Sequence, residues 1–160
     1  VYVPDFSNSE LGLDVGLYRK GDGRKIIIDA HRDLDCFAET IKMQKRLGIF
    51  TIGGGGPRNW AQQVAPYLDI IEKRLGKGKG GGFIRYYYGV RICPDPVHYG
   101  HLSGSTFEEA VSWGKLVPRE EGGRFAEVHH DASICWPLIL RAVIERLGKR
   151  KIEKRLPIVL

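Results

Sequence analysis

The sequence has 160 residues, of which 25 are lysine or arginine and 19 are aspartate or glutamate, so its formal charge is +6. Apolar residues make up 42% and charged residues 28%, which is typical of a globular protein and excludes a disordered one. This length suits a single domain over 1–160, or part of a larger one. No apolar run approaches the roughly 18–20 residues that span a bilayer, which excludes a protein with transmembrane helices.

The three cysteines, Cys36, Cys93 and Cys135, are odd in number and show no CxxC spacing. A disulfide framework and a cysteine zinc site are therefore not expected, whereas a reducing, cytoplasmic setting is. No signal peptide is recognisable at the start of the sequence. The chain opens on Val1 with VYVPDF, a stretch typical of an interior strand, so we expect a partial domain whose preceding part lies elsewhere.

Hydrophobic patterning predicts alternating strands and helices. Apolar runs rich in β-branched and aromatic residues predict buried strands over 25–30, 48–52, 83–92 and 125–129. Helical spacing lies between and after them, over 31–46, 59–75 and 133–149, and Pro66 is expected to kink or restart the second helix. This alternation predicts an α/β fold with a mainly parallel sheet covered by helices on both faces. Ligands of such folds bind at the carboxyl ends of the strands.

Two segments are basic. Residues 76–82, GKGKGGG, predict a flexible loop, and the C-terminal tail 146–160 contains six Lys/Arg and one Glu within 146–155. Together with the net charge, the tail could bind nucleic acid, but no recognised binding motif accompanies it and no aromatic residues are interleaved with the charges. A solvated face, or a docking site for an acidic protein, is favoured.

Four glycines, Gly53, Gly54, Gly55 and Gly56, stand between a predicted strand and a predicted helix. Glycines there let the backbone approach a phosphate, and the helix that follows offers its free N–H groups to the anion. The run is neither a GxGxxG motif nor a P-loop. A tight strand–helix turn without a ligand is the alternative, and the spacing alone leaves both open.

The segment 107–115, FEEAVSWGK, combines a carboxylate, an indole and a lysine. Glu109 and Trp113 are four residues apart, so a helix would place them on one face, and Gly114 would end that helix before Lys115. A carboxylate beside an indole binds organic ammonium groups, and a desolvated lysine nearby could attack an imine or carbonyl carbon. The alternative is structural, with Trp113 in the core and Lys115 a solvated side chain after the helix.

The segment 127–133, EVHHDAS, follows a predicted strand end. His129 and His130 would point to opposite sides of a strand and cannot easily share a metal. Asp131 could hydrogen-bond a ribose hydroxyl, or it could cap the following helix. No metal site is expected, because HExxH-like spacing is also missing from the other histidines, His31, His98 and His101.

Taken together, these segments resemble the C-terminal half of the deoxyhypusine synthase family. The blocks that carry the resemblance occur in the family's order and are IGGGGPRNWAQQ (52–63), VRICPDPVHYGHLSGSTFEEAVSWGK (90–115) and EVHHDASICWPL (127–138). A weaker match, FSNSELGLD (6–14), extends the resemblance to essentially the whole chain. Within these blocks, the stretches PRNWAQQ and VRICPDPVHYG are most similar to the archaeal and bacterial branch of the family. The resemblance implies a Rossmann-like fold.

The family's chemistry, which the resemblance implies here, begins with oxidation of spermidine by NAD to an imine. A lysine then attacks, releases 1,3-diaminopropane and holds the aminobutyl group. This group passes to an acceptor amine, which in deoxyhypusine synthases is one lysine of translation factor 5A, and is reduced by the retained NADH. By resemblance, Lys115 is the covalent nucleophile. The implied amine-binding residues are Glu109, Trp113, Asn59 and Asp14, and the positions that match NAD contacts are Gly53, Gly54, Gly55, Gly56, Asp131 and Ala132.

The sequence departs from the family pattern at several positions. Asn59 stands where the eukaryotic enzymes have a histidine that grips the polyamine, and asparagine can hydrogen-bond an amine but cannot titrate near neutral pH. Leu102 replaces an aspartate of the eukaryotic amine site, and Asn8 falls where an aspartate is usual. The cofactor-loop residues around Pro94 and Asp95 also differ in type. These changes leave the amine and its acceptor open.

Family members are homotetramers with sites at dimer interfaces, so the resemblance also implies a homo-oligomer, or a second chain that supplies the N-terminal half. Two alternatives to deoxyhypusine synthesis stay open. One is a homospermidine-synthase-like transfer to a small amine, which a comparison of putrescine with a translation-factor-5A-type protein would separate. The other is a non-catalytic or regulatory subunit, for which a functional Lys115→Ala variant would argue. Neither a membrane nor a nucleic acid is expected as a partner.

Overall fold

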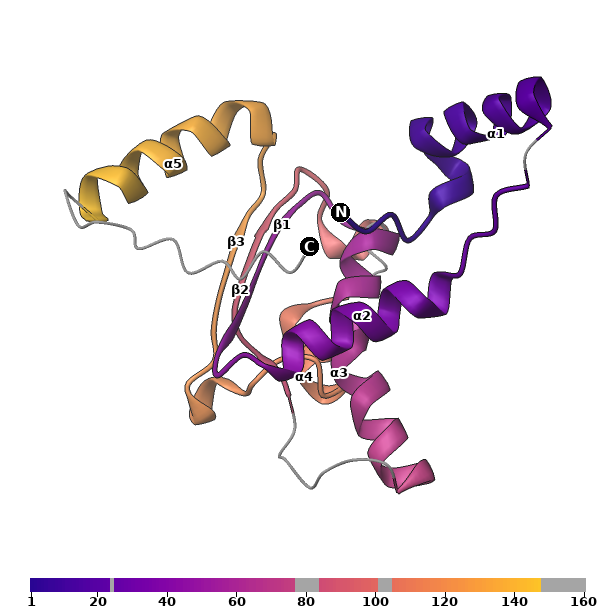
Figure 1. The fold of residues 1–160 in the computed structure, drawn as a ribbon. Coiled ribbons are helices and arrows are strands. Elements are labelled where there is room, and N and C mark those ends of the chain that lie inside the picture. Colours follow the sequence, from indigo (N-terminus) through magenta and orange to yellow (C-terminus); the bar gives the residue numbers. More distant parts are fainter. Residues whose placement is uncertain (24, 77–83, 101–104, 148–160) are drawn as a thin grey trace.

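A computed structural model describes residues 1–23, 25–76, 84–100 and 105–147. The helices are α1 (Glu10–Asp22), α2 (Ala30–Lys42), α3 (Gly56–Leu75), α4 (Phe107–Ser112) and α5 (Ala132–Leu147), and the strands are β1 (Leu47–Ile52), β2 (Tyr86–Ile92) and β3 (Arg124–Val128) (Figure 1). Short 3-10 helices are η1 (Phe6–Asn8), η2 (Val97–Tyr99) and η4 (Arg119–Glu121). Most of the predicted basic loop, from residue 77, and the tail from residue 148 lie outside the described residues.

The three strands form one parallel sheet in the order β1-β2-β3. Phe50 of β1 pairs with Val90 of β2, and Val90 pairs with Ala126 of β3, so the carboxyl ends of all three strands reach the same edge. Helix α3 connects β1 to β2, and α4 connects β2 to β3. The predicted α/β architecture with a parallel sheet is therefore confirmed.

The hydrophobic core lies on one face of the sheet, beneath α2, α3 and α4. Its buried members are Ala38, Ile41, Val64, Tyr86, Phe107, Ala110 and Leu116. Tyr86 ties the sheet to α3, because its hydroxyl donates a 2.8 Å hydrogen bond to the carbonyl oxygen of Ala61. Because Phe107 and Ala110 of α4 and Leu116 just after it belong to this core, the core also fixes the FEEAVSWGK segment.

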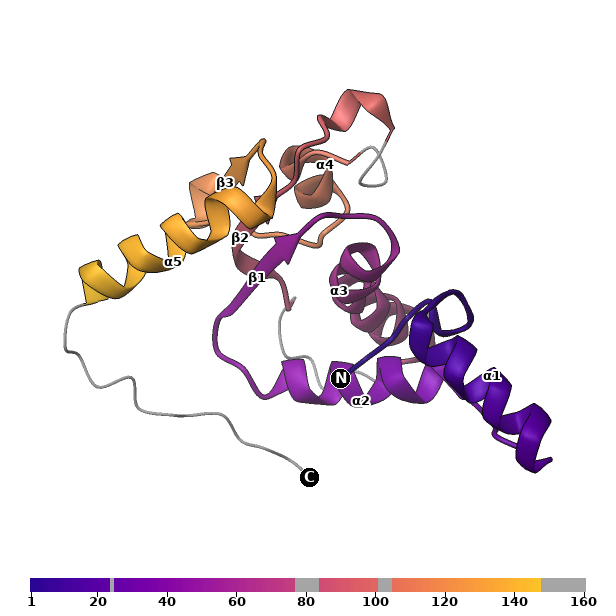
Figure 2. The same ribbon diagram turned by 90° about the horizontal axis from the view of Figure 1, so that it is seen from above.

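Helix α5 lies on the opposite side of the sheet (Figure 2). Trp136 of α5 contacts Phe50 of β1 at 4.9 Å between ring centroids, yet none of the residues of α5, all of which are described, is buried. Phe50 and Ile52 remain 45% and 55% exposed. Helices therefore flank both faces as predicted, but only one face is packed by the described chain.

One predicted strand is absent from the described part of the chain, and one helix was not predicted. Residues 25–30 form no strand: no described strand pairs with them, Ile26, Ile27 and Ile28 are exposed, and Asp29 instead caps α2 by accepting hydrogen bonds from the amides that follow it. Helix α1 was not predicted, because its apolar residues form no continuous stripe and glycines interrupt it.

Other boundaries also shift. Helix α3 does not restart at Pro66, which lies inside one continuous helix, and β2 begins at Tyr86 rather than at residue 83. Within the described ranges, no helix combines the length and the apolar character that crossing a membrane requires.

Candidate active site

Helix α4 is short and capped at both ends, which fixes the residue that follows it. The Thr106 hydroxyl accepts a 3.0 Å hydrogen bond from the Glu109 amide at the start of the helix. At its end, Gly114 adopts a left-handed φ of 71°, and the amides of Gly114 and Lys115 donate to the carbonyls of Val111 and Ala110, both at 2.9 Å. This is a Schellman motif, which turns the chain as the sequence predicted.

The turn after α4 buries Lys115 against the sheet. The Lys115 carbonyl accepts a 3.0 Å hydrogen bond from the Tyr86 amide, and Leu116 forms a parallel bridge with Tyr86. The Lys115 side chain is 8% exposed, and its Nζ donates a 2.9 Å hydrogen bond to Oδ1 of Asn59, near the start of α3. Lys115 is therefore not the solvated lysine of the structural alternative.

The surroundings of Lys115 favour its neutral amine. Burial lowers the pKa of the Lys115 ammonium, and the positive charge of Arg58 lowers it further, whereas the carboxylate of Glu109 opposes the shift. Arg58 precedes Asn59 in α3 and is itself buried. A lysine in such a site has a larger unprotonated fraction near neutral pH than a solvated one, and only the unprotonated amine is a nucleophile.

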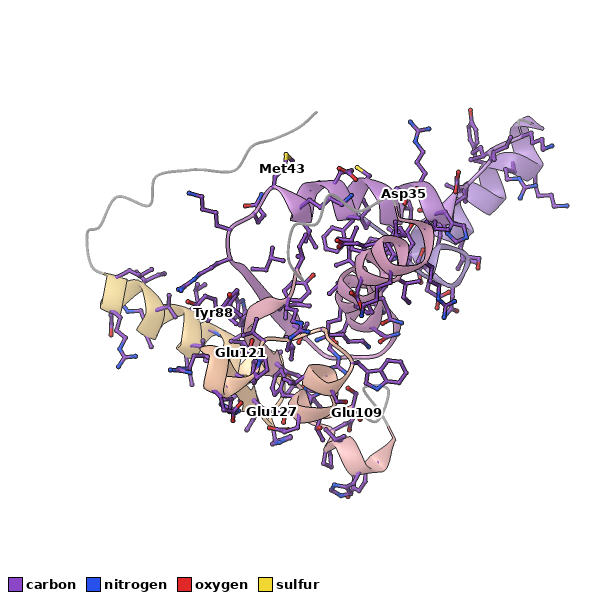
Figure 3. The ribbon with its side chains drawn as sticks, turned by 90° about the horizontal axis from the view of Figure 1, so that it is seen from below. Asp35, Met43, Tyr88, Glu109, Glu121 and Glu127 are labelled. Carbon is purple, nitrogen blue, oxygen red and sulfur yellow. The ribbon has the colours of Figure 1, made fainter. Side chains whose placement is uncertain are left out.

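An aromatic surface lies beside this amine. Lys115 Nζ is 5.9 Å from the centroid of the Trp113 ring, and the Trp113 side chain is 62% exposed, so the indole does not belong to the core. Glu109 lies exposed on α4 (Figure 3), close enough to influence the pKa of Lys115. An indole face and a carboxylate together offer cation–π attraction and charge pairing to an organic ammonium group.

The glycine run makes the turn from β1 to α3. Gly53 and Gly55 have φ values of 76° and 82°, and the Gly53 amide donates a 2.8 Å hydrogen bond to the carbonyl of Ile92. A Cβ added at Gly53, Gly55 or Gly56 would meet no atom within 4 Å, and Gly54 is exposed. Because Gly55 also leaves the start of α3 without a side-chain cap, the turn has the open, amide-rich form that fits a phosphate group.

Asp131 follows β3 at the same edge of the sheet. Its Oδ1 accepts hydrogen bonds from the amide and the hydroxyl of Ser133, at 2.7 and 2.6 Å, and these bonds lower the pKa of the carboxyl. Asp131 therefore does cap α5, which begins at Ala132, while remaining exposed and ionised. The capping and the ribose interpretations are compatible, because the side chain lies on the surface beyond the strand end.

Asp14 is not brought to this site. It lies exposed on α1, and Figures 1 and 2 both show α1 projecting away from the sheet and from α4. Asn8 lies in η1, where its side-chain amide donates to Asp5 at 3.3 Å. Leu102 and His101 fall outside the described residues.

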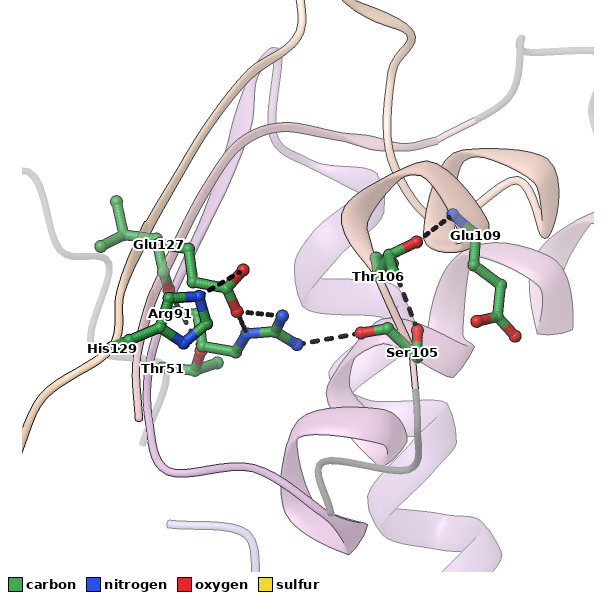
Figure 4. Close-up of polar contacts among 8 residues, drawn as sticks. Thr51, Arg91, Ser105, Thr106, Glu109, Glu127 and His129 are labelled. Carbon is green, nitrogen blue, oxygen red and sulfur yellow. Dashed lines mark hydrogen bonds and ion pairs between the residues drawn. The ribbon is translucent and has the colours of Figure 1, made fainter. Parts of the chain in front are cut away.

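Sequence reasoning missed a charged network between β2, β3 and α4. Arg91 is 1% exposed and forms an ion pair with Glu127, whose other carboxylate oxygen lies 3.6 Å from Nε2 of His129 (Figure 4). The signal was present, because each charged residue interrupts an otherwise apolar strand pattern. Among the described residues, no three metal-ligating side chains gather as a metal site requires.

Comparison with known proteins identifies the family of this chain. The family model described as deoxyhypusine synthase matches residues 1–143. A probable deoxyhypusine synthase 2 of Methanosarcina acetivorans is 34% identical over 91% of this chain and 39% of its own length. The corresponding protein of Archaeoglobus fulgidus is 29% identical over 90% of the chain and 43% of its own length. The chain thus spans about two fifths of the length of the curated relatives it matches, and it belongs to the deoxyhypusine synthase family.

Proposed function

We propose that this chain carries the nucleophile of an NAD-dependent aminobutyl transfer from spermidine to an acceptor amine. The observation that supports this most directly is the buried Lys115, hydrogen-bonded to Asn59 and flanked by the exposed Trp113 indole. A stabilising role explains this buried lysine poorly, because burying an ammonium group costs free energy. Family membership supplies the reaction class.

Each residue around Lys115 has a distinct task in the proposed reaction. The neutral Lys115 amine attacks the carbon of the protonated spermidine imine, and a Nζ–C bond forms. One proton passes from Nζ to the old imine nitrogen, the old C–N bond breaks, and 1,3-diaminopropane leaves with that bond's electron pair, while a protonated imine to Lys115 remains. Asn59 orients the amine lone pair through its Oδ1. Glu109 and Trp113 hold the terminal ammonium of the substrate. Asp14 lies apart from Lys115, so its proposed contact with the amine requires an interface between chains.

The glycine turn and Asp131 are proposed to hold NAD. The open turn Gly53–Gly56 fits the pyrophosphate, and the ionised Asp131 fits a ribose hydroxyl, with Ala132 beside it. NAD, when bound, accepts the hydride removed from spermidine and later returns it, so the overall transfer is redox-neutral. Both groups lie at the carboxyl edge of the sheet, as expected of nucleotide sites in such folds.

The acceptor proposed is a lysine of a translation-factor-5A-type protein, because the relatives are described as probable deoxyhypusine synthases. Transfer to a small amine such as putrescine would use the same nucleophile and is the alternative. The described thiols of Cys36, Cys93 and Cys135 are free, which suits a reducing compartment such as the cytoplasm. Because the chain spans about two fifths of its relatives, we propose that it acts in a homo-oligomer or with a chain that carries the remaining family length.

A borohydride trap tests this proposal. The chain is incubated with NAD and spermidine, alone and together with a chain carrying the family's remaining length, then reduced, digested and mapped by mass spectrometry. An aminobutyl adduct on Lys115 is expected, and none in the Lys115→Arg variant. Lys42→Arg is the matched control, because Lys42 is exposed and paired with Glu39. Failure of both preparations to modify Lys115, with the protein folded and NAD bound, would overturn the proposal.

A further inference from the structure

Arg91 joins three segments that meet beneath the candidate site. It pairs in register with Glu127 of the neighbouring strand, and its Nε and Nη2 both contact Oε1 of that carboxylate. Its remaining terminal nitrogen, Nη1, donates a 3.0 Å hydrogen bond to the carbonyl oxygen of Ser105. Figure 4 shows the guanidinium lying between Glu127 on one side and Ser105 on the other.

Ser105 directly precedes Thr106, the capping residue of α4, so this bond holds the backbone immediately before the helix. The Arg91 guanidinium also lies 5.2 Å from the ring centroid of Phe107, the first residue of α4, and Phe107 stacks on Phe125 of β3. One buried side chain therefore fixes both the backbone before α4 and the first side chain of α4 against the sheet.

We infer that Arg91 is a positioning residue for the amine site, an inference that rests on the proposed function. Helix α4 has only six residues, with Glu109 in its first turn and Lys115 just beyond its last. A displacement of the start of α4 therefore moves the amine-binding carboxylate relative to the sheet, which holds Lys115 through Tyr86. Misplacement of a substrate-binding group by about 1 Å can lower the reaction rate up to about a hundredfold.

The chemistry of the pair favours positioning over stability. A buried ion pair can often be replaced by apolar residues of similar volume without loss of stability, whereas removal of one partner alone is strongly destabilising. Arginine is the side chain that can face a carboxylate and a backbone carbonyl simultaneously, through donors in a fixed plane. The ammonium group of a lysine at position 91 could not contact the Glu127 carboxylate and the Ser105 carbonyl with the same geometry.

Arg91→Met is expected to lower the melting temperature and adduct formation together, because the half-buried Glu127 carboxylate loses its arginine. The double variant Arg91→Met/Glu127→Met is expected to recover the melting temperature, while the spermidine concentration for half-maximal Lys115 adduct stays raised by about tenfold. Arg119→Met is the matched control, since the Arg119 guanidinium lies over Phe125, the other ring of the stacked pair, and has no described contact with Ser105.

A second measurement does not depend on catalysis. Hydrogen exchange of the amides in 106–115 is expected to be faster in the double variant than in the wild type or in Arg119→Met. A stable double variant with wild-type half-maximal spermidine and wild-type exchange would overturn the inference. If the wild type forms no adduct, the proposed function fails, and the exchange measurement alone still decides whether Arg91 holds α4.

Discussion

Lys115 Nζ and Asn59 Oδ1 lie 2.9 Å apart, and this hydrogen bond joins the exit of α4 to the start of α3. The same end of α3 carries the glycine turn that fits a phosphate. The proposed nucleophile and the proposed cofactor turn are therefore connected by one short helical segment, from Gly56 to Asn59. In this chain a neutral amide, rather than a titrating group, faces the lysine, so the protonation of Lys115 depends on burial and on fixed charges.

Replacing that amide by a carboxylate should slow the reaction. In Asn59→Asp, a negative charge within hydrogen-bonding distance stabilises the Lys115 ammonium and raises the pKa of Lys115. We expect the rate of adduct formation at pH 7 to fall by about tenfold or more and to recover as the pH rises. Gln44→Glu, which adds the same charge just beyond the end of α2, is the control. An unchanged rate at pH 7 in Asn59→Asp would show that the bond does not affect the nucleophile.

Arg58 should lower the pH at which Lys115 becomes reactive, in addition to the effect of burial. Protonated lysine cannot attack, so the adduct rate rises with pH until the amine is neutral, and a nearby cation moves this rise to lower pH. In Arg58→Gln the cation is lost, the pKa of Lys115 rises, and the rate at pH 7 is expected to fall by roughly three- to tenfold. Arg58→Lys keeps the charge and should keep the profile. Coincident pH profiles for the glutamine variant and the wild type would contradict this role.

Glu109 should affect amine binding more than the reaction step. Glu109→Gln removes a carboxylate that attracts the substrate ammonium but also opposes the lowered pKa of Lys115. The half-maximal spermidine concentration should rise roughly three- to tenfold, as for an exposed charge pair of about 1 kcal/mol. The rate at saturating spermidine should hold or increase. Glu108→Gln, at the exposed neighbouring residue, is the matched control. Equal effects of the two substitutions would contradict the role of Glu109 in binding the amine.

The sequence was a good guide where local patterns and tertiary packing agree. The parallel strands around Ile49 and Val90 and the turn at Gly114 follow from apolar runs and from glycine's conformational freedom. The segment around Ile27 was read wrongly as a strand, because its β-branched run is real but no described strand pairs with it. A high strand propensity does not by itself supply a neighbouring strand with which the segment can pair.

Site geometry was less predictable than site composition. The sequence pattern identified Glu109, Trp113 and Lys115 as candidates within one short segment, but it could not show that the lysine is buried while the indole is exposed. The contact with Asn59 crosses 56 positions of sequence and depends on how α3 packs against the Tyr86 region. The contacts of Arg91 with Glu127 and Ser105 could not be predicted either, because hydrogen bonds across a core leave no periodic pattern in the local sequence.

The glycine turn should tolerate substitution unequally. Gly55 has φ 82° and ψ −145°, a conformation that only glycine adopts readily, so Gly55→Ala should lower the free energy of unfolding by about 1–3 kcal/mol. Gly56 begins α3 and faces open space, so Gly56→Ala should be neutral or stabilising by up to about 1 kcal/mol. If the turn holds a phosphate, the added methyl should nevertheless weaken NAD binding. Denaturant unfolding and a NAD titration measure the two effects separately, and Gly56→Ala with unaltered NAD affinity would argue against a phosphate at this turn.

Asp131 can be tested for capping and for cofactor binding in one series. Asp131→Ala removes the acceptor of both Ser133 hydrogen bonds and should reduce the helical circular dichroism and the melting temperature. Asp131→Asn keeps an oxygen that can cap α5 but loses the charge, so it should keep the helix. The lowered pKa implies that the capping stabilisation of the wild type is present above the usual carboxyl pKa and is lost as the pH falls through the lowered value. The asparagine variant should lack this loss at acid pH. If it also binds NAD as tightly as the wild type, Asp131 caps the helix and has no part in holding the ribose; a weaker NAD affinity with an intact helix assigns it both tasks.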